Sequence, residues 1–255
     1  MDIVIPIKFV PDLVEQLEID STGAALDYTF MRLISNELDD HALEQALLLK
    51  ERYGGTVTAI ALDSGDVDET LFTAIAKGAD RVIKVKGEFG EGINNHAAAS
   101  VLEAVLKNVS FDLILTGTQS VDDLDGSIGA LLAARLGLSY VGYVTGVTSV
   151  DGKVIARKEY PGGLLAEMEV WLPAVLGIQA AEKPPRYIVT SLIMQAMKTA
   201  HIEEIDAGHA EHRGAVRGVR MARPEAAAHA EMIAGNVGKV ADALVALLKE
   251  RGLLS

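Results

Sequence analysis

The chain has no cysteine, no long apolar run and few basic residues. The absence of cysteine excludes disulfides and cysteine metal sites, and it suits a reducing compartment. No apolar run is long enough to span a bilayer, so no direct membrane insertion is expected. The first ten residues, MDIVIPIKFV, carry an acid at position 2 and are typical of a first strand, not of a basic signal peptide. We therefore expect a cytoplasmic protein.

Basic residues are outnumbered, with 23 Lys and Arg against 36 Asp and Glu and a net charge of −13. Nucleic acids and anionic membranes both favour a basic surface, so neither is expected as a partner. Apolar residues make up 49% of the chain, which excludes a disordered protein. The length of 255 residues suits one large domain, or one domain with a substantial arm.

Short apolar runs alternate with amphipathic segments through the first half of the chain. Strands are predicted at residues 3–10, 56–62, 81–85 and 113–115. Helices are predicted at residues 36–53, 68–77, 95–108 and 130–136. This alternation predicts an α/β fold with a Rossmann-like parallel sheet and helices on both faces. Pro6 removes a ladder N–H, which indicates an edge strand or a strand end near a ligand.

The second half of the chain has a different pattern. Asp151-Gly152 predicts a tight turn between strands at 144–150 and 153–158, and further strands are expected at 164–171 and 173–179. The run KPPRY at 183–187 ends the compact region, because consecutive prolines favour extended backbone. We expect an α/β domain at residues 1–187, followed at 188–255 by an arm. The arm has no core of its own and contains a helix at 228–248 that packs on a partner subunit.

The stretch FDLILTGTQSVDDLDGSIGALLAARL, residues 111–136, is the first candidate for a binding site. It predicts a strand, a loop at 117–129 and a helix, an arrangement whose free N–H groups and helix dipole favour anions. Gly117, Gly126 and Gly129 allow sharp turns and close approach to a ligand. The loop matches neither Walker A nor GxGxxG. The alternative is an ordinary strand-to-helix turn capped by Ser127.

Ligands of parallel α/β sheets bind at the carboxyl ends of strands, where the strand order reverses. Three predicted strand ends are therefore candidates, at residues 6–8, 63–65 and 117–120.

Several motifs in a fixed order resemble the β subunit of electron transfer flavoproteins. They are IPIK at 5–8, NELDDHALEQALLLKE at 36–51, AKGADRV at 76–82, GTQSVDDLDGSIG at 117–129, LPAVLGIQ at 172–179, KPPRY at 183–187 and IMQA at 193–196. The resemblance implies an adenine-nucleotide-binding α/β fold that pairs with an α subunit. It also implies AMP as a structural ligand of this chain, with the redox-active FAD held mainly by α. Electrons would pass from a flavin-dependent dehydrogenase to an acceptor, so this chain would be an electron carrier subunit and not an enzyme.

Carried over by position, the resemblance implies a set of nucleotide contacts at the first strand end, the start of the first long helix and the glycine-rich loop. They are Pro6, Asn36, Glu37, Leu38, Asp39, Ser64, Gly117, Thr118, Gln119, Ser120, Val121, Asp122, Asp123, Leu124, Asp125, Gly126, Ser127 and Ile128. A carboxylate beside a phosphate is unfavourable, so the three loop aspartates are expected to point away or to cap the helix. Asn36 has an alternative role as the N-cap of its helix.

The chain departs from the family pattern at three places. A bifurcating branch holds a second FAD in β and tends to carry DGDTAQVG-like loops, whereas this loop reads DDLDGSIG, which favours AMP. The family commonly has a proline after the asparagine where this chain has NELD, which leaves the contacts of Glu37 and Leu38 open. The resemblance places the family's recognition segment at residues 183–198, where the usual leucine anchor for dehydrogenases is replaced by Thr190. Leu192, Ile193 and Met194 are then the candidate contacts, and the alternative is that the arm buries them.

The sequence contains no recognisable catalytic constellation. His41 has no serine or cysteine nearby and is expected at the surface, and His209 and His212 lack a third metal ligand, so no metal site is predicted. A stand-alone nucleotide-binding or hydrolysing protein is an alternative, with Lys8 and Asp39 as the only suggestive pair. A structural subunit with an empty nucleotide site is a third possibility.

Overall fold

The computed structural model describes residues 1–65, 67–87, 89, 93–123, 126–207, 219–224, 230 and 232–254. The chain divides into two compact units, Met1–Arg220 and Met221–Ser255. The strands of the first unit are β1 (Asp2–Ile7), β2 (Phe9–Pro11), β3 (Leu33–Ser35), β4 (Thr56–Leu62), β5 (Arg81–Lys86), β6 (Leu113–Gly117), β7 (Ser139–Val150), β8 (Lys153–Tyr160), β9 (Leu164–Trp171), β10 (Ala174–Ile178) and β11 (Glu203–Asp206). Its helices are α1 (Glu37–Tyr53), α2 (Val67–Lys77), α3 (Asn95–Leu106), α4 (Ile128–Leu136) and α5 (Thr190–Thr199).

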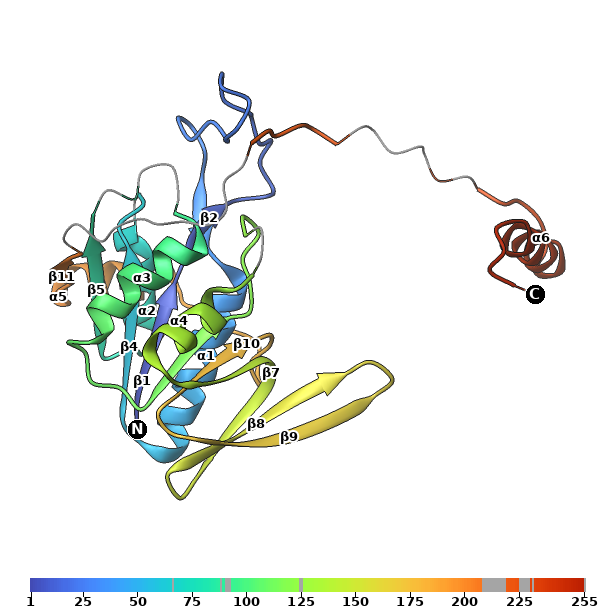
Figure 1. The fold of residues 1–255 in the computed structure, drawn as a ribbon. Coiled ribbons are helices and arrows are strands. Elements are labelled where there is room, and N and C mark those ends of the chain that lie inside the picture. Colours follow the sequence, from blue (N-terminus) through green and yellow to red (C-terminus); the bar gives the residue numbers. More distant parts are fainter. Residues whose placement is uncertain are drawn as a thin grey trace. The chain divides into compact units, whose positions relative to one another are not determined.

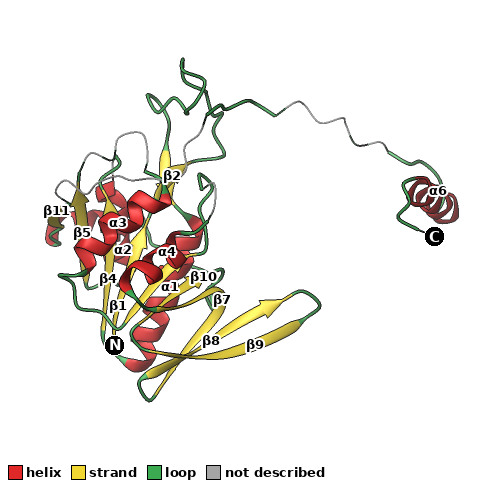
Figure 2. Cartoon of the chain, viewed as in Figure 1, coloured by secondary structure: helices red, strands yellow, loops and turns green. Residues whose placement is uncertain are grey.

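The main sheet has the strand order β11-β5-β4-β1-β6-β10-β7-β8-β9 (Figures 1 and 2). Neighbouring strands are parallel from β11 to β7, and β8 and β9 continue the sheet as antiparallel hairpins. The turn predicted at Asp151-Gly152 joins β7 to β8, and Val150 pairs with Lys153. The predicted α/β fold with a largely parallel sheet is confirmed, and so are the added hairpins.

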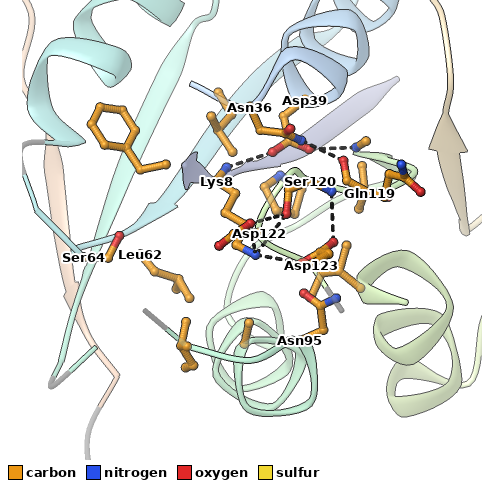
Figure 3. Close-up of a pocket in the computed structure, with 18 of the residues that line it drawn as sticks. Lys8, Asn36, Asp39, Leu62, Ser64, Asn95, Gln119, Ser120, Asp122 and Asp123 are labelled. Carbon is orange, nitrogen blue, oxygen red and sulfur yellow. Dashed lines mark hydrogen bonds and ion pairs between the residues drawn. The ribbon is translucent and has the colours of Figure 1, made fainter. Parts of the chain in front are cut away.

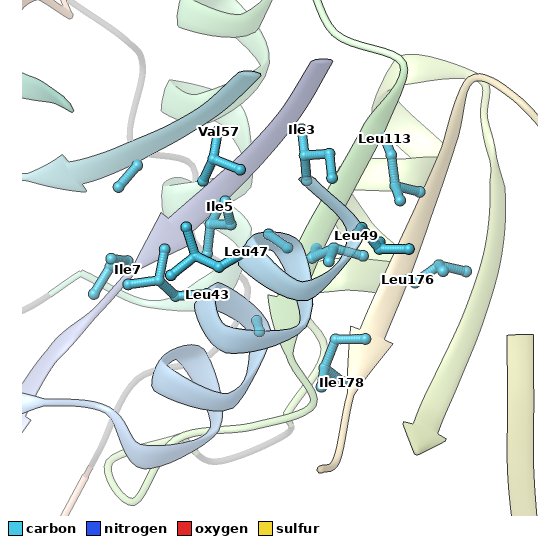
Figure 4. Close-up of a cluster of buried hydrophobic side chains, with 14 of the residues drawn as sticks. Ile3, Ile5, Ile7, Leu43, Leu47, Leu49, Val57, Leu113, Leu176 and Ile178 are labelled. Atoms are coloured by element: carbon cyan, nitrogen blue, oxygen red, sulfur yellow. The ribbon is translucent and has the colours of Figure 1, made fainter. Parts of the chain in front are cut away.

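Two apolar layers hold helices on opposite faces of this sheet. On one face, Leu43, Leu47 and Leu49 of α1 pack against Ile3, Ile5 and the neighbouring strands (Figure 4). On the other face, Leu102 and Leu106 of α3 and Leu132 of α4 pack against Val4, Ile60 and Ile114. Each of these side chains is at least 97% buried. Strands buried on both faces explain why their sequences are continuous apolar runs and not alternating ones.

The first strand ends earlier than the sequence predicts, because β1 stops at Ile7 and β2 begins at Phe9. The prediction of an edge strand at Pro6 is wrong, since β1 lies inside the sheet between β4 and β6. Its ladder with β6 contains only Ile3 and Val4, however. Pro6 therefore lies beyond the last β6 partner, where its missing N–H costs no hydrogen bond to that strand.

The segment after β10 continues on the first unit. Arg186 of the KPPRY run forms a bidentate ion pair with Glu44 of α1, whose side chain is 4% exposed, at distances of 2.9 Å. The chain then forms α5, which lies against α2, and β11, which pairs with β5 in parallel. Neither element was predicted from the sequence, and the division between the two compact units falls after Arg220.

The second unit contains α6 (Val237–Glu250), an amphipathic helix with no buried residue. The N-cap of this helix is Asn236, whose side chain accepts a hydrogen bond from the Lys239 N–H. The predicted helix was too long at its N-terminal end, because described residues 232–236 are not helical. The cap explains the later start, since an asparagine cap satisfies N–H groups that would otherwise lack a partner.

Candidate functional site

A pocket lies at the carboxyl ends of β1, β4 and β6 (Figure 3). The chain passes from β1 to β4 and β5 on one side and returns with β6 on the other, so the strand order reverses at β1. The β1–β4 ladder extends to Ile7, whereas the β1–β6 ladder ends at Val4, and the cavity opens where β1 and β6 separate. All three predicted strand ends contribute to its lining, through Pro6, Ser64 and Gly117.

Lys8 forms a charged cluster with the loop after β6. Its Nζ lies 2.9 Å from Asp122 Oδ1, 2.8 Å from Asp123 Oδ1 and 3.0 Å from Ser120 Oγ. The Ser120 N–H donates to Asp123 Oδ2 at 3.0 Å. Burial alone would lower the pKa of Lys8, but the two carboxylates outweigh it and raise that pKa. Asp122 and Asp123 therefore pair with Lys8, because a partly buried lysine requires counter-charges.

Asp39 joins the start of α1 to the ends of two strands. Its Oδ2 accepts the Lys8 backbone N–H at 2.9 Å, and its Oδ1 accepts the Gly117 N–H at 2.8 Å. The side chain lies in the lining of the pocket, and the residue is 5% exposed. Burial raises the pKa of Asp39 from 3.8 to about 6, although the two N–H groups favour the ionised form.

The Asp39→Asn substitution should remove the contribution of this carboxyl group to the pH dependence of the free energy of unfolding. Between about pH 4 and pH 6 the folded protein holds a proton on Asp39 that the unfolded chain has released, so the wild type gains stability as the pH falls through this window. The gain is about 3 kcal/mol, at about 1.4 kcal/mol per pKa unit. Urea unfolding from about pH 7 to about pH 4 measures it. If the free energies of unfolding of wild type and variant differed by the same amount at every pH, the raised pKa of Asp39 would be contradicted.

Asn36 occupies the N-cap position of α1, but its side chain makes no capping hydrogen bond. Its Nδ2 instead donates to the Gln119 carbonyl at 3.0 Å and so ties the glycine-rich loop to the helix. Ser127 likewise occupies the N-cap position of α4, and its hydroxyl does not cap that helix. Side-chain capping, the alternative role for both residues, is therefore not observed.

Two of the three loop glycines are needed because a side chain at their positions would collide with neighbouring protein atoms. A Cβ on Gly117 would lie 2.6 Å from Asp39 Oδ1 and 2.8 Å from Leu38 Cβ, and a Cβ on Gly129 would lie 2.7 Å from Thr116 Oγ1. Gly126 has a φ of +56°, so only this glycine serves the sharp turn that the sequence suggested for all three. Gly117 and Gly129 therefore allow α1 and α4 to pack closely on β6, and close approach to a ligand stays a prediction.

Apolar side chains form the wall of the pocket, and the sequence did not single them out. Phe9, Tyr28 and Leu33 come from the segment between β1 and α1, while Ile93 and Leu102 come from the α3 region. Thr116 belongs to the lining and is 1% exposed, and its Oγ1 has no hydrogen-bond partner among the described residues. The apolar periodicity of α3 could have indicated Leu102, but only the topology brings the residues 9–33 to this edge.

The predicted contacts fall into three groups. The lining of the pocket includes Pro6, Asn36, Asp39, Ser64, Gly117, Gln119, Ser120, Asp122, Asp123 and Ile128. The remaining described contacts adjoin it without being part of that lining: Glu37, Leu38, Thr118, Val121, Gly126 and Ser127. Leu124 and Asp125 lie outside the residues that the structure describes.

The recognition segment forms α5, which begins at Thr190. Leu192 is 45% exposed and Met194 is 50% exposed, while Ile193 is half-buried. Thr190, Leu192 and Met194 are therefore accessible on the first unit, and the helix itself is held against α2.

The pair proposed for nucleotide hydrolysis, Lys8 and Asp39, is not arranged for it. The Lys8 ammonium contacts Asp122 and Asp123, and the Asp39 carboxylate contacts backbone N–H groups.

His41 is half-buried and its Nδ1 accepts the Ala181 N–H at 3.2 Å, so the expected surface position is wrong. Within the described ranges there is no cluster of three metal-ligating side chains, and no helix there has the length and apolarity to cross a membrane. His209 and His212 lie outside those ranges.

Comparisons with known proteins agree on one family. Residues 32–210 match the model of the electron transfer flavoprotein domain. The chain is 33% identical to an electron transfer flavoprotein subunit beta of Methylophilus methylotrophus, with 98% of each chain covered. It is 30% identical to the protein of the same name from Clostridium acetobutylicum, again with 98% of each chain covered. The chain belongs to the family of electron transfer flavoprotein β subunits.

Proposed function

We propose that the chain is the small subunit of a heterodimeric electron transfer flavoprotein. In this role it binds AMP as a structural ligand, helps to hold the FAD of the α subunit and passes electrons from a flavin-dependent dehydrogenase to an acceptor. The proposal includes a cytoplasmic location and an electron carrier that makes and breaks no bonds itself. The observation that carries it is the pocket at the reversal of strand order, in a chain of this family.

The lining residues suit an adenine nucleotide. Phe9, Tyr28 and Leu102 offer an apolar wall for a base, and the buried Thr116 hydroxyl is available to a polar edge. The phosphate would be held by backbone N–H groups of the first turn of α4 and by those loop N–H groups that do not bind Asp39 or Asp123. AMP bound there would join β1, α1 and the loop, because residues of all three line the pocket.

The FAD supplies the redox chemistry when it is bound, and this chain supplies contacts and electrostatics. The test is a cycle of electron transfer in the purified complex with α. A donor dehydrogenase with its substrate should bleach the flavin absorbance, and an electron acceptor should restore it. Neither step should require ATP, and the complex should not hydrolyse ATP in the presence of magnesium. ATP turnover without flavin reduction would favour the hydrolase instead.

Leu192→Asp should weaken docking of the dehydrogenase without disrupting the heterodimer. A buried charge in a docking surface is costly, and exposed apolar side chains on a rigid helix are typical contacts. We expect kcat/KM for flavin reduction by the dehydrogenase to fall by at least about tenfold. Gln195→Ala changes an exposed polar residue of the same helix and should leave this value unchanged. Equal values for the two variants would contradict the assignment of Leu192 to the docking surface.

A further inference from the structure

The pocket contains an unusual balance of charge for a nucleotide site. Among its described lining residues, Lys8 is the only cation, and three carboxylates belong to Asp39, Asp122 and Asp123. No arginine or histidine is part of the described lining. With all four groups ionised, the carboxylates exceed the cation, so the site repels negative charge on a ligand.

The single cation is already engaged. The Lys8 ammonium contacts three oxygens, those of Asp122, Asp123 and Ser120, at distances of 2.8 to 3.0 Å. An ammonium has three N–H donors, so these contacts use its full capacity. A phosphate could bind Lys8 only by displacing one of these three oxygens, and it would then lie beside at least one of the two carboxylates.

The two loop carboxylates are held in place and cannot simply turn away. Asp123 Oδ2 accepts the Ser120 N–H, and its side chain is 4% exposed. Asp122 Oδ1 accepts the Ser120 hydroxyl at 2.6 Å, and its side chain is 26% exposed. Their charges therefore remain at the pocket when a ligand enters.

We propose that Asp122 and Asp123 act as a charge filter that makes this pocket selective for a nucleoside monophosphate over the diphosphate and triphosphate. The inference rests on the proposed AMP site and names which ligand charge that site tolerates. The backbone N–H groups of the first turn of α4 can hold a single phosphate. Each further phosphate adds negative charge near two fixed carboxylates without a free cation to offset it, and we expect about tenfold weaker binding for each.

The test is a competition experiment on the purified complex of this chain with α. The complex is exchanged with radiolabelled AMP, and unlabelled AMP, ADP and ATP compete in EDTA at about pH 8, where Asp39 with its pKa of about 6 is ionised. AMP should compete about tenfold better than ADP, and ADP better than ATP. Raising the salt concentration should bring the affinities for AMP, ADP and ATP closer together, because salt screens the charge of the partly exposed Asp122.

Asp122→Asn removes one charge and keeps an oxygen that can accept the Ser120 hydroxyl. It should lower the ratio of AMP to ADP affinity by at least about threefold while AMP still binds. Asp151→Asn removes a carboxylate from the β7–β8 turn and serves as the control with an unchanged ratio. An unchanged ratio in Asp122→Asn, or equal affinities in the wild type, would overturn the charge filter alone. A wild-type complex that binds none of the three would overturn the AMP site as well.

Discussion

Truncation of the chain after Ala207 is expected to abolish pairing with the α subunit and to leave the first unit folded. The shortened chain keeps β11, whose end is secured by the Ala207 N–H donating to the Lys86 carbonyl at 2.9 Å. It loses α6, none of whose residues is buried in the second unit and whose Leu244, Val245 and Leu247 are exposed there. An amphipathic helix without a core of its own is stabilised by packing on another surface.

Co-expression with tagged α measures this effect directly. The full-length chain should co-purify with α, and the truncated chain should not, while its circular dichroism and cooperative unfolding remain those of a folded α/β protein. A shorter truncation that removes only residues 253–255, which follow α6, is the matched control and should still pair. A chain ending at Ala207 that still co-purified with α would contradict the role of the arm.

Gly117→Ala should have the largest effect of any single substitution considered for the pocket. The new Cβ would lie 2.6 Å from Asp39 Oδ1 and 2.9 Å from the Asp39 backbone nitrogen, so the start of α1 must move away from β6. This movement also breaks the hydrogen bond from the Gly117 N–H to Asp39. We expect a loss of about 3 kcal/mol in the free energy of unfolding and a melting temperature lower by about 6–12 °C. AMP binding should be lost with it.

Gly23→Ala provides the contrast. Gly23 has a φ of +71° and nothing within 4 Å of an added Cβ, so alanine there meets only the cost of the left-handed conformation, about 1–2 kcal/mol. Differential scanning calorimetry of both variants gives their melting temperatures. The comparison separates the steric clash in Gly117→Ala from the backbone strain in Gly23→Ala. Wild-type stability in Gly117→Ala would show that α1 and β6 are not in the close contact described.

The sequence predicts the elements of the first half well, because buried parallel strands and amphipathic helices have clear periods. Residues 56–62 and 95–106 fall within such segments and were placed nearly to the residue. The elements β11 and α5 were missed for a physical reason. Glu203–Asp206 is a short, polar edge strand whose pairing with β5 depends on residues more than a hundred positions away, and no local pattern encodes such a contact.

Topology brings the three candidate strand ends to one pocket, whereas the contacts between its side chains could not be predicted from the sequence. Three strand ends and the rule of reversed strand order were sufficient to bring Pro6, Ser64 and Gly117 together. The pairing of Asp122 and Asp123 with Lys8 was not predicted, because Lys8 lies more than a hundred residues earlier in the chain. Apolar wall residues such as Tyr28 were missed because they belong to an irregular segment without a period.

The central claim is that this chain holds AMP in its pocket while the partner holds FAD. The most direct measurement is to denature the purified complex with α and to separate and quantify the nucleotides released. The account predicts AMP and FAD in equal amounts, and loss of the AMP alone from a complex built with Gly117→Ala. FAD released in twice the amount of α, without AMP, would contradict the account and assign this chain to the bifurcating branch.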